Sequence, residues 1–195
     1  MRGVTIVYLH GFNSSPQTIK GRLLGSAVAA LPAPPRYHVP QLSHRPREAV
    51  DSVAQWLADH ARDDAVTLIG SSLGGFYATA LAERLAVRAI VVNPAVRPGA
   101  SLESLVGPQQ NLHTGERYEL TQEHLAEMRA LAVERISRPE RYLLLQRSGD
   151  ELLDWREAVR HYAGAWQYVG GGGDHGWADF TPMIPTVVQF AGCGS

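Results

Sequence analysis

A serine in a glycine-rich stretch is the feature of this sequence best suited to chemistry. Residues 68–76 read LIGSSLGGF, in which Gly70, Ser72 and Gly74 form the pattern G-x-S-x-G. In this pattern the serine lies on a sharp strand-to-helix turn, and its neighbours two positions away must be small so that strand and helix can approach. Ser72 is therefore the candidate nucleophile, and Ser71 occupies a spacer position. The string alone also suits a structural turn, but it is neither a Walker loop nor the dinucleotide fingerprint.

A serine nucleophile needs a base, and the base needs an acid that orients it. On a strand-to-helix turn of this kind, the acid and then the histidine follow later strands. Asp150 comes shortly after the apolar run YLLLQR, and His175 comes after WQYVG and a run of glycines. We therefore predict a triad of Ser72, Asp150 and His175. Glu151 and Asp154 are alternatives for the acid, although Asp154 stands where it would cap the following helix.

Backbone amides beside the serine would stabilise a negatively charged intermediate. We expect these amides to be those of Leu73, directly after the nucleophile, and Phe12, in the loop after the first strand. His10 is expected to brace that loop without touching substrate. Arg97, in NPAVRP, is a candidate contact for an anionic group of the substrate, although such an arginine more often pairs with an acid. The other histidines show no metal-ligand spacing, so we expect neither a metal nor a cofactor.

Apolar, β-branched runs alternate along the chain with runs of helical periodicity. The expected strands are 4–10, 37–42, 66–71, 89–96, 142–147 and 166–170, and the expected helices are 18–31, 48–62, 74–86, 155–163 and 177–190. This alternation predicts an α/β fold, with a parallel sheet covered by helices on both faces. Residues 98–137 are too long for an ordinary connection and are expected to form a small helical cap or lid. We expect one domain over residues 1–195, with this cap inserted in it.

Composition excludes several classes of protein. The formal net charge of -1 on 195 residues gives no basic surface for nucleic acid. Cys193 is the one cysteine, so no disulfide forms within the chain, and no signal segment is recognised at the start. No apolar run approaches the roughly 20 residues of a membrane span. We therefore expect a cytoplasmic protein with a small-molecule partner, while the oligomeric state is left open.

Several blocks of the sequence together resemble the α/β-hydrolases, and more narrowly the small bacterial YqiA-like esterases. These blocks are LHGFNSSP, LIGSSLGGFYAT, VVNPAVRP, TGERYEL, GDELLDWREAV and GGGDHGW, and they span nearly the whole chain. The resemblance implies esterase or thioesterase activity on acyl substrates, with Ser72, Asp150 and His175 at the family's triad positions. It also implies a reduced sheet of six parallel strands in the order 2-1-3-4-5-6, without the two antiparallel strands that begin larger hydrolases.

Two other functions remain open at this point. The chain could be a ligand-binding or regulatory module that keeps the fold without turnover, although such a module has no need of a triad. Among enzymes, a carbon–carbon bond hydrolase uses the same three residues, and a peptidase is a weaker alternative because nothing suggests an extended peptide groove.

Overall fold

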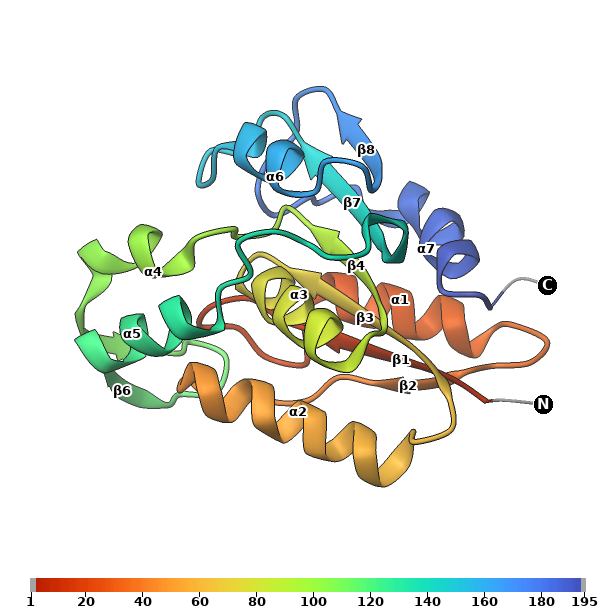
Figure 1. Cartoon of the computed structure of the whole chain (residues 1–195), viewed down its shortest axis with the longest axis horizontal. Helices are drawn as coiled ribbons and strands as arrows, with labels where there is room; N and C mark the ends of the chain where they lie inside the picture. Colours follow the sequence, from red (N-terminus) through yellow and green to blue (C-terminus); the bar gives the residue numbers. More distant parts are fainter. Residues whose placement is uncertain (1–2, 194–195) are drawn as a thin grey trace.

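The protein is built on one parallel sheet that runs through its centre (Figure 1). The computed structural model describes residues 3–193. The strands of this sheet are β1 (Val4–Leu9), β2 (Arg36–His38), β3 (Ala65–Ser71), β4 (Arg88–Val92), β7 (Tyr142–Arg147) and β8 (Trp166–Gly170). Their order is β2-β1-β3-β4-β7-β8 and every neighbouring pair is parallel, so the predicted order is confirmed.

Helices cover both faces of the sheet, and each face has its own apolar core. Residues of α2 (Pro46–His60), α3 (Leu73–Leu85) and α6 (Trp155–His161) pack on one face, and residues of α1 (Ile19–Ala29) and α7 (Ile184–Phe190) pack on the other. Along β1, Val7 and Leu9 belong to the first core while Ile6 and Tyr8 belong to the second. Burial on both faces explains why the strands read as continuous apolar runs.

Three elements are clearly shorter than the sequence predicts, and a proline stands near the shortened end of each. The strand expected over 89–96 ends at Val92, shortly before Pro94. The strand expected over 37–42 ends at His38, because Pro40 has no backbone N–H to donate to the sheet edge. The helix expected over 177–190 is replaced by a 3-10 turn (Thr181–Met183) followed by α7. Proline stands in the first turn of each of these two helical pieces, which is where the missing donor costs least.

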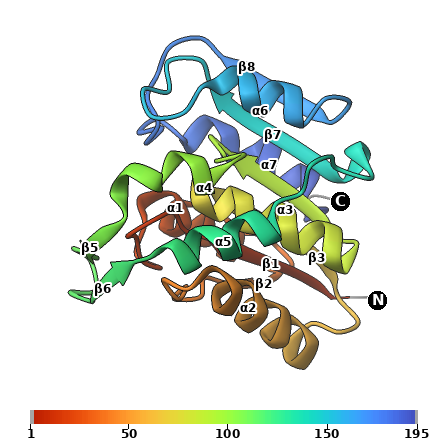
Figure 2. The ribbon, with the colours of Figure 1, turned by 60° about the vertical axis from the view of Figure 1, so that its left-hand side comes forward.

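The segment 98–137 differs in part from the helical cap that the sequence predicts. It contains α4 (Pro98–Ser101), a 3-10 turn (Glu103–Leu105) and α5 (Gln122–Leu131), but also an antiparallel hairpin of β5 (Gly107–Gln110) and β6 (Arg117–Leu120). Figure 2 turns this side forward and shows the hairpin projecting beyond α4 and α5. Within residues 3–193, every helix is too short or too polar to cross a membrane.

Candidate active site

The turn between β3 and α3 holds Ser72 in a strained conformation. Its φ is 56° and its ψ is -121°, in a region that non-glycine residues rarely occupy. A Cβ at Gly70 would lie 2.1 Å from the carbonyl oxygen of Gly74, and a Cβ at Gly74 would lie 2.1 Å from that of Leu9. Both contacts are with backbone, so no side-chain movement could relieve them. The two glycines of G-x-S-x-G are therefore required by the close approach of β1, β3 and α3.

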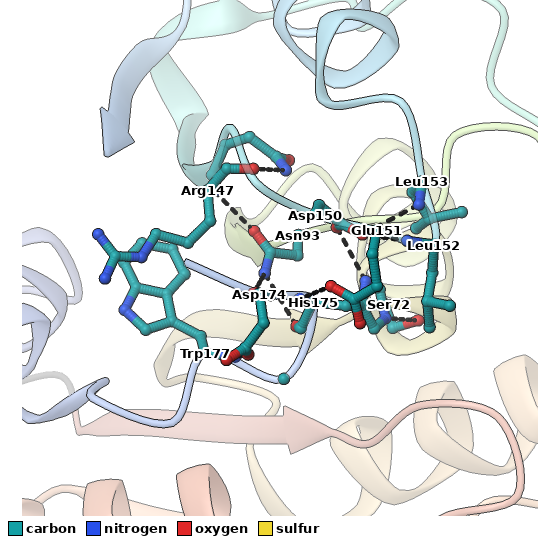
Figure 3. A network of polar contacts seen from close by, with 12 residues as sticks. Ser72, Asn93, Arg147, Asp150, Glu151, Leu152, Leu153, Asp174, His175 and Trp177 are labelled. Carbon is teal, nitrogen blue, oxygen red and sulfur yellow. Dashed lines mark hydrogen bonds and ion pairs between the residues drawn. The ribbon is translucent and has the colours of Figure 1, made fainter. Parts of the chain in front are cut away.

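The structure brings Ser72, His175 and Asp150 into one hydrogen-bonded row (Figure 3). The His175 Nε2 atom lies 2.9 Å from the Ser72 Oγ, and its Nδ1 lies 2.8 Å from the Asp150 Oδ2. The three side chains follow the ends of β3, β7 and β8, which meet at the same edge of the sheet. Since a carboxylate only accepts, Nδ1–H donates to Asp150 and Nε2 is free to take the serine proton.

Asp150 is held ionised at the closed end of this row. Its side chain is fully buried, and its Oδ1 accepts hydrogen bonds from the amides of Leu152 (3.0 Å) and Leu153 (2.9 Å). Burial acts to raise the pKa of this carboxyl, but the hydrogen bonds from His175 and the two amides outweigh it and hold the pKa below its usual value. The acid therefore carries a negative charge that can stabilise a protonated imidazole.

The two alternative acids have other partners. The carboxylate of Glu151 accepts from the backbone N–H of His175 at 2.9 Å, so it contacts the main chain and not the imidazole. Asp154 caps α6 by accepting from the amide of Arg156 at 3.0 Å, as the sequence indicates. Neither of these two side chains bonds to the imidazole of His175.

The amides expected to stabilise an oxyanion lie beside Ser72. Phe12 and Leu73 both line the cavity over the serine, and across residues 3–193 neither backbone N–H has an acceptor. A Cβ at Gly11 would be 3.4 Å from the Ser72 Cβ, which shows how closely this loop passes the turn. His10 braces the loop from behind, donating from Nδ1 to the Gly11 carbonyl (3.0 Å) and accepting the amide of Leu42 at Nε2 (3.2 Å). Burial lowers the pKa of His10, which matches this neutral role.

Asn93 is a positioning residue that sequence reasoning missed. It is fully buried after β4, with a φ of 41°. Its Nδ2 donates to the carbonyls of Asp174 (3.2 Å) and His175 (2.9 Å), while its Oδ1 accepts the amide of Arg147 (2.9 Å) (Figure 3). One side chain thus fastens the histidine loop to the end of β7. The only sequence signal is an Asn-Pro pair after a strand, which is also typical of an ordinary turn.

The hairpin β5–β6 holds the loop that carries the Phe12 amide. Asn13, at a φ of 49°, donates to Gln109 Oε1 (3.2 Å) and accepts the hydroxyl of Tyr118 (2.8 Å). Asn111 adds a third bond from its Nδ2 to the carbonyl of Ser14 (2.7 Å). The inserted segment is therefore connected directly to the site, through polar contacts that the sequence does not reveal.

A cavity of about 760 Å³ opens over Ser72 and His175. Its apolar walls come from the segment after β4, represented by Leu102 and Leu105, and from the loop after β7, represented by Leu152. Leu105 and Leu152 are 43% and 68% exposed, so apolar side chains also surround the opening. A carbonyl bound at Ser72 therefore has apolar surface beside it.

Two groups of residues lie largely outside this cavity. Arg97, the candidate contact for an anionic group, is exposed and is not among the residues that line the cavity. Six apolar side chains of the inserted segment could either line a channel or form the segment's own core, and of these Leu105 alone reaches the cavity wall. The others are buried or partly buried in the protein's core, or exposed elsewhere: Leu112, Leu120, Leu125, Met128 and Leu131.

Comparison with known proteins identifies the family and the fold. The family described as "Uncharacterised protein family (UPF0227)" matches residues 5–192. Alpha/beta hydrolase domain-containing protein 10 from mouse has a TM-score of 0.74 at 18% identity, over 100% of this chain and 93% of that one. Est1E from Butyrivibrio proteoclasticus has a TM-score of 0.72 at 13% identity, over 96% of this chain and 86% of that one. The esterase domain of a protein from Rhodothermus marinus has a TM-score of 0.69 at 16% identity, over 98% of this chain and 88% of that one. The expected resemblance is confirmed: the chain has the α/β-hydrolase fold and belongs to the UPF0227 family.

Proposed function

We propose that this protein hydrolyses carboxylic esters or thioesters of small acyl compounds through a covalent acyl-enzyme at Ser72. The observation that supports this most directly is the bonded row of Ser72, His175 and Asp150, which ends in a cavity of about 760 Å³. Relatives of the same fold are named as esterases, which agrees with the proposal. No cofactor is needed, because the nucleophile, base and acid are all side chains of the chain itself.

The reaction runs in two halves. The Ser72 Oγ attacks the carbonyl carbon while its proton passes to the His175 Nε2, and the buried charge of Asp150 stabilises the imidazolium. The amides of Phe12 and Leu73 hold the oxygen that becomes negative. The alcohol or thiol then leaves with the proton from Nε2. In the second half, His175 takes a proton from water, the hydroxide oxygen attacks the acyl carbon, and the acid leaves as Ser72 regains its proton.

The proposal extends to the inserted segment and to the compartment. We assign residues 98–137 the role of a cap, because α4 and the following turn supply part of the cavity wall and the hairpin holds the Phe12 loop. We place the protein in the cytoplasm, because a chain with a single cysteine suits a reducing compartment.

The test is turnover of a series of nitrophenyl esters and acyl thioesters by the parent protein, Ser72→Ala and Ser71→Ala. Ser71→Ala is a matched control, since it removes a neighbouring hydroxyl that lies outside the row. We expect Ser72→Ala to lose at least about 10³-fold in kcat while keeping the parent's melting temperature. A parent that binds esters without turning them over would instead identify a ligand-binding module. Turnover retained by Ser72→Ala would exclude Ser72 as the nucleophile.

A further inference from the structure

The wall of the active-site cavity carries positive charge and no negative charge. Lys20 and Arg22, both on α1, line it, and no aspartate or glutamate stands among its lining residues within 3–193. The whole chain has 18 basic and 19 acidic residues, so this imbalance is a local property of the cavity. Arg22 is exposed and forms no ion pair within residues 3–193.

Lys20 fixes where this charge lies relative to the reaction. Its ammonium group donates a hydrogen bond to the carbonyl of Gly176, the residue directly after the catalytic histidine. Burial lowers the pKa of Lys20, and the negative charge of Asp174 acts against this shift. The Asp174 Oδ1 accepts the amide of Trp177 at 2.6 Å, and Asp174 does not line the cavity. The charge of Lys20 therefore lies on the His175 side of Ser72.

The position of His175 tells which half of a substrate meets this charge. Its Nε2 gives its proton to the departing oxygen or sulfur, so the alcohol or thiol half of the substrate lies on the histidine side. The apolar side chains of Leu102 and Leu105 line the same cavity and are available to the acyl half. The cavity thus offers apolar surface for the acyl group and cationic side chains for the leaving group.

We propose that Lys20 and Arg22 form a subsite for an anionic group, a phosphate or a carboxylate, on the alcohol or thiol half of the substrate. This inference rests on the proposed hydrolase function and narrows its substrate class. Arginine and lysine bind such groups through charge-assisted hydrogen bonds, and a group that is anionic before and after cleavage gains from them in binding.

The experiment compares two nitrophenyl esters with the same short acyl group. One ester is uncharged and releases 4-nitrophenol. The other carries a carboxylate on its leaving group and releases 5-hydroxy-2-nitrobenzoate. Both are assayed with the parent, Arg22→Gln, Arg22→Lys and Arg62→Gln. Arg62 is exposed and lies outside the cavity wall, so its substitution makes the same change of net charge elsewhere.

We expect Arg22→Gln to lower kcat/KM for the anionic ester about tenfold more than for the neutral ester, chiefly through KM. Arg22→Lys should restore much of the difference, and Arg62→Gln should leave the ratio of the two esters at the parent value. Raising the salt concentration should weaken the preference. Equal losses on both esters would show a merely structural role for Arg22 and overturn the subsite.

Binding without turnover separates this inference from the proposed function. In Ser72→Ala, 5-hydroxy-2-nitrobenzoate should bind more tightly than 4-nitrophenol by calorimetry, and adding Arg22→Gln should remove the difference. If the parent hydrolyses neither ester but this difference is present, the hydrolase proposal fails while the anion subsite stands. If the parent hydrolyses both esters and the two products bind equally, the subsite is refuted alone.

Discussion

Replacing Asn93 tests whether one buried amide positions His175, the proposed catalytic base. Asn93→Ala removes three hydrogen bonds, to the carbonyls of Asp174 and His175 and from the amide of Arg147. An unsatisfied buried N–H costs about 1–3 kcal/mol, and each further lost bond costs about 1 kcal/mol. Alanine also tolerates the positive φ of this position less well than asparagine, by about 1 kcal/mol. These contributions together give an expected loss of about 4–6 kcal/mol.

A loss of this size is measurable in both stability and turnover. For a chain of 195 residues, a loss of about 4–6 kcal/mol corresponds to a fall of roughly 8–24 °C in Tm by calorimetry. We expect kcat to fall about 10²-fold, because a displacement of the imidazole by about 1 Å costs that much. Asn93→Asp is the matched variant: it keeps an acceptor for the Arg147 amide but sets a carboxylate against two carbonyls. It should recover part of the Tm and little of the activity. A Tm within 1 °C of the parent and an unchanged kcat in Asn93→Ala would refute this reasoning.

Three further substitutions probe other contacts of the site. Gly74→Ala should lower the free energy of unfolding by about 1–3 kcal/mol, because the new Cβ would meet the Leu9 carbonyl. Gly171→Ala is the control: it has open space around it and should cost under about 0.5 kcal/mol. Equal unfolding free energies of the two variants would contradict this reasoning. Asp150→Asn should reduce kcat by up to about 10⁴-fold. Its Tm should lie below the parent's by the full amount above pH 5 and by less below pH 4, because the pKa of Asp150 in the folded protein lies below the unfolded value of about 3.9. A difference in Tm that does not change with pH would contradict the assignment. Tyr118→Phe removes the hydroxyl that holds the Phe12 loop and should lower kcat several-fold without changing the secondary structure by circular dichroism; parent activity would show that the loop needs no support from the hairpin.

The nucleophile turn could be predicted because its constraint is local. The close contacts at Gly70 and Gly74 arise within a few residues of Ser72, so the sequence pattern records the geometry directly. The strand order is what the resemblance to the α/β-hydrolases implies. The positions of Asp150 and His175 follow from the order of apolar runs, since the ends of parallel strands share one edge of the sheet. For the turn and these two positions, chain order and local spacing carry the information.

The features that were missed depend on contacts between distant residues. Asn93 meets residues 54 and 82 positions away, and nothing in its neighbourhood marks them. Strands β5 and β6 have four residues each and are mostly polar, so they show no alternation long enough to indicate a hairpin. Arg97 looked suited to an anion, but the path of the chain into α4 leaves it outside the cavity, while Lys20 and Arg22 on the first helix line its wall.

The central claim is that Ser72 is activated by His175 and Asp150, and covalent labelling tests it most directly. A fluorophosphonate loses fluoride when an activated serine oxygen attacks its phosphorus, and the adduct remains on that residue. Peptide mass spectrometry of the labelled parent should find one adduct, on Ser72, and labelling of Asp150→Asn should be much slower. No adduct, an adduct on another residue, or equal labelling of Ser72→Ala would contradict the account.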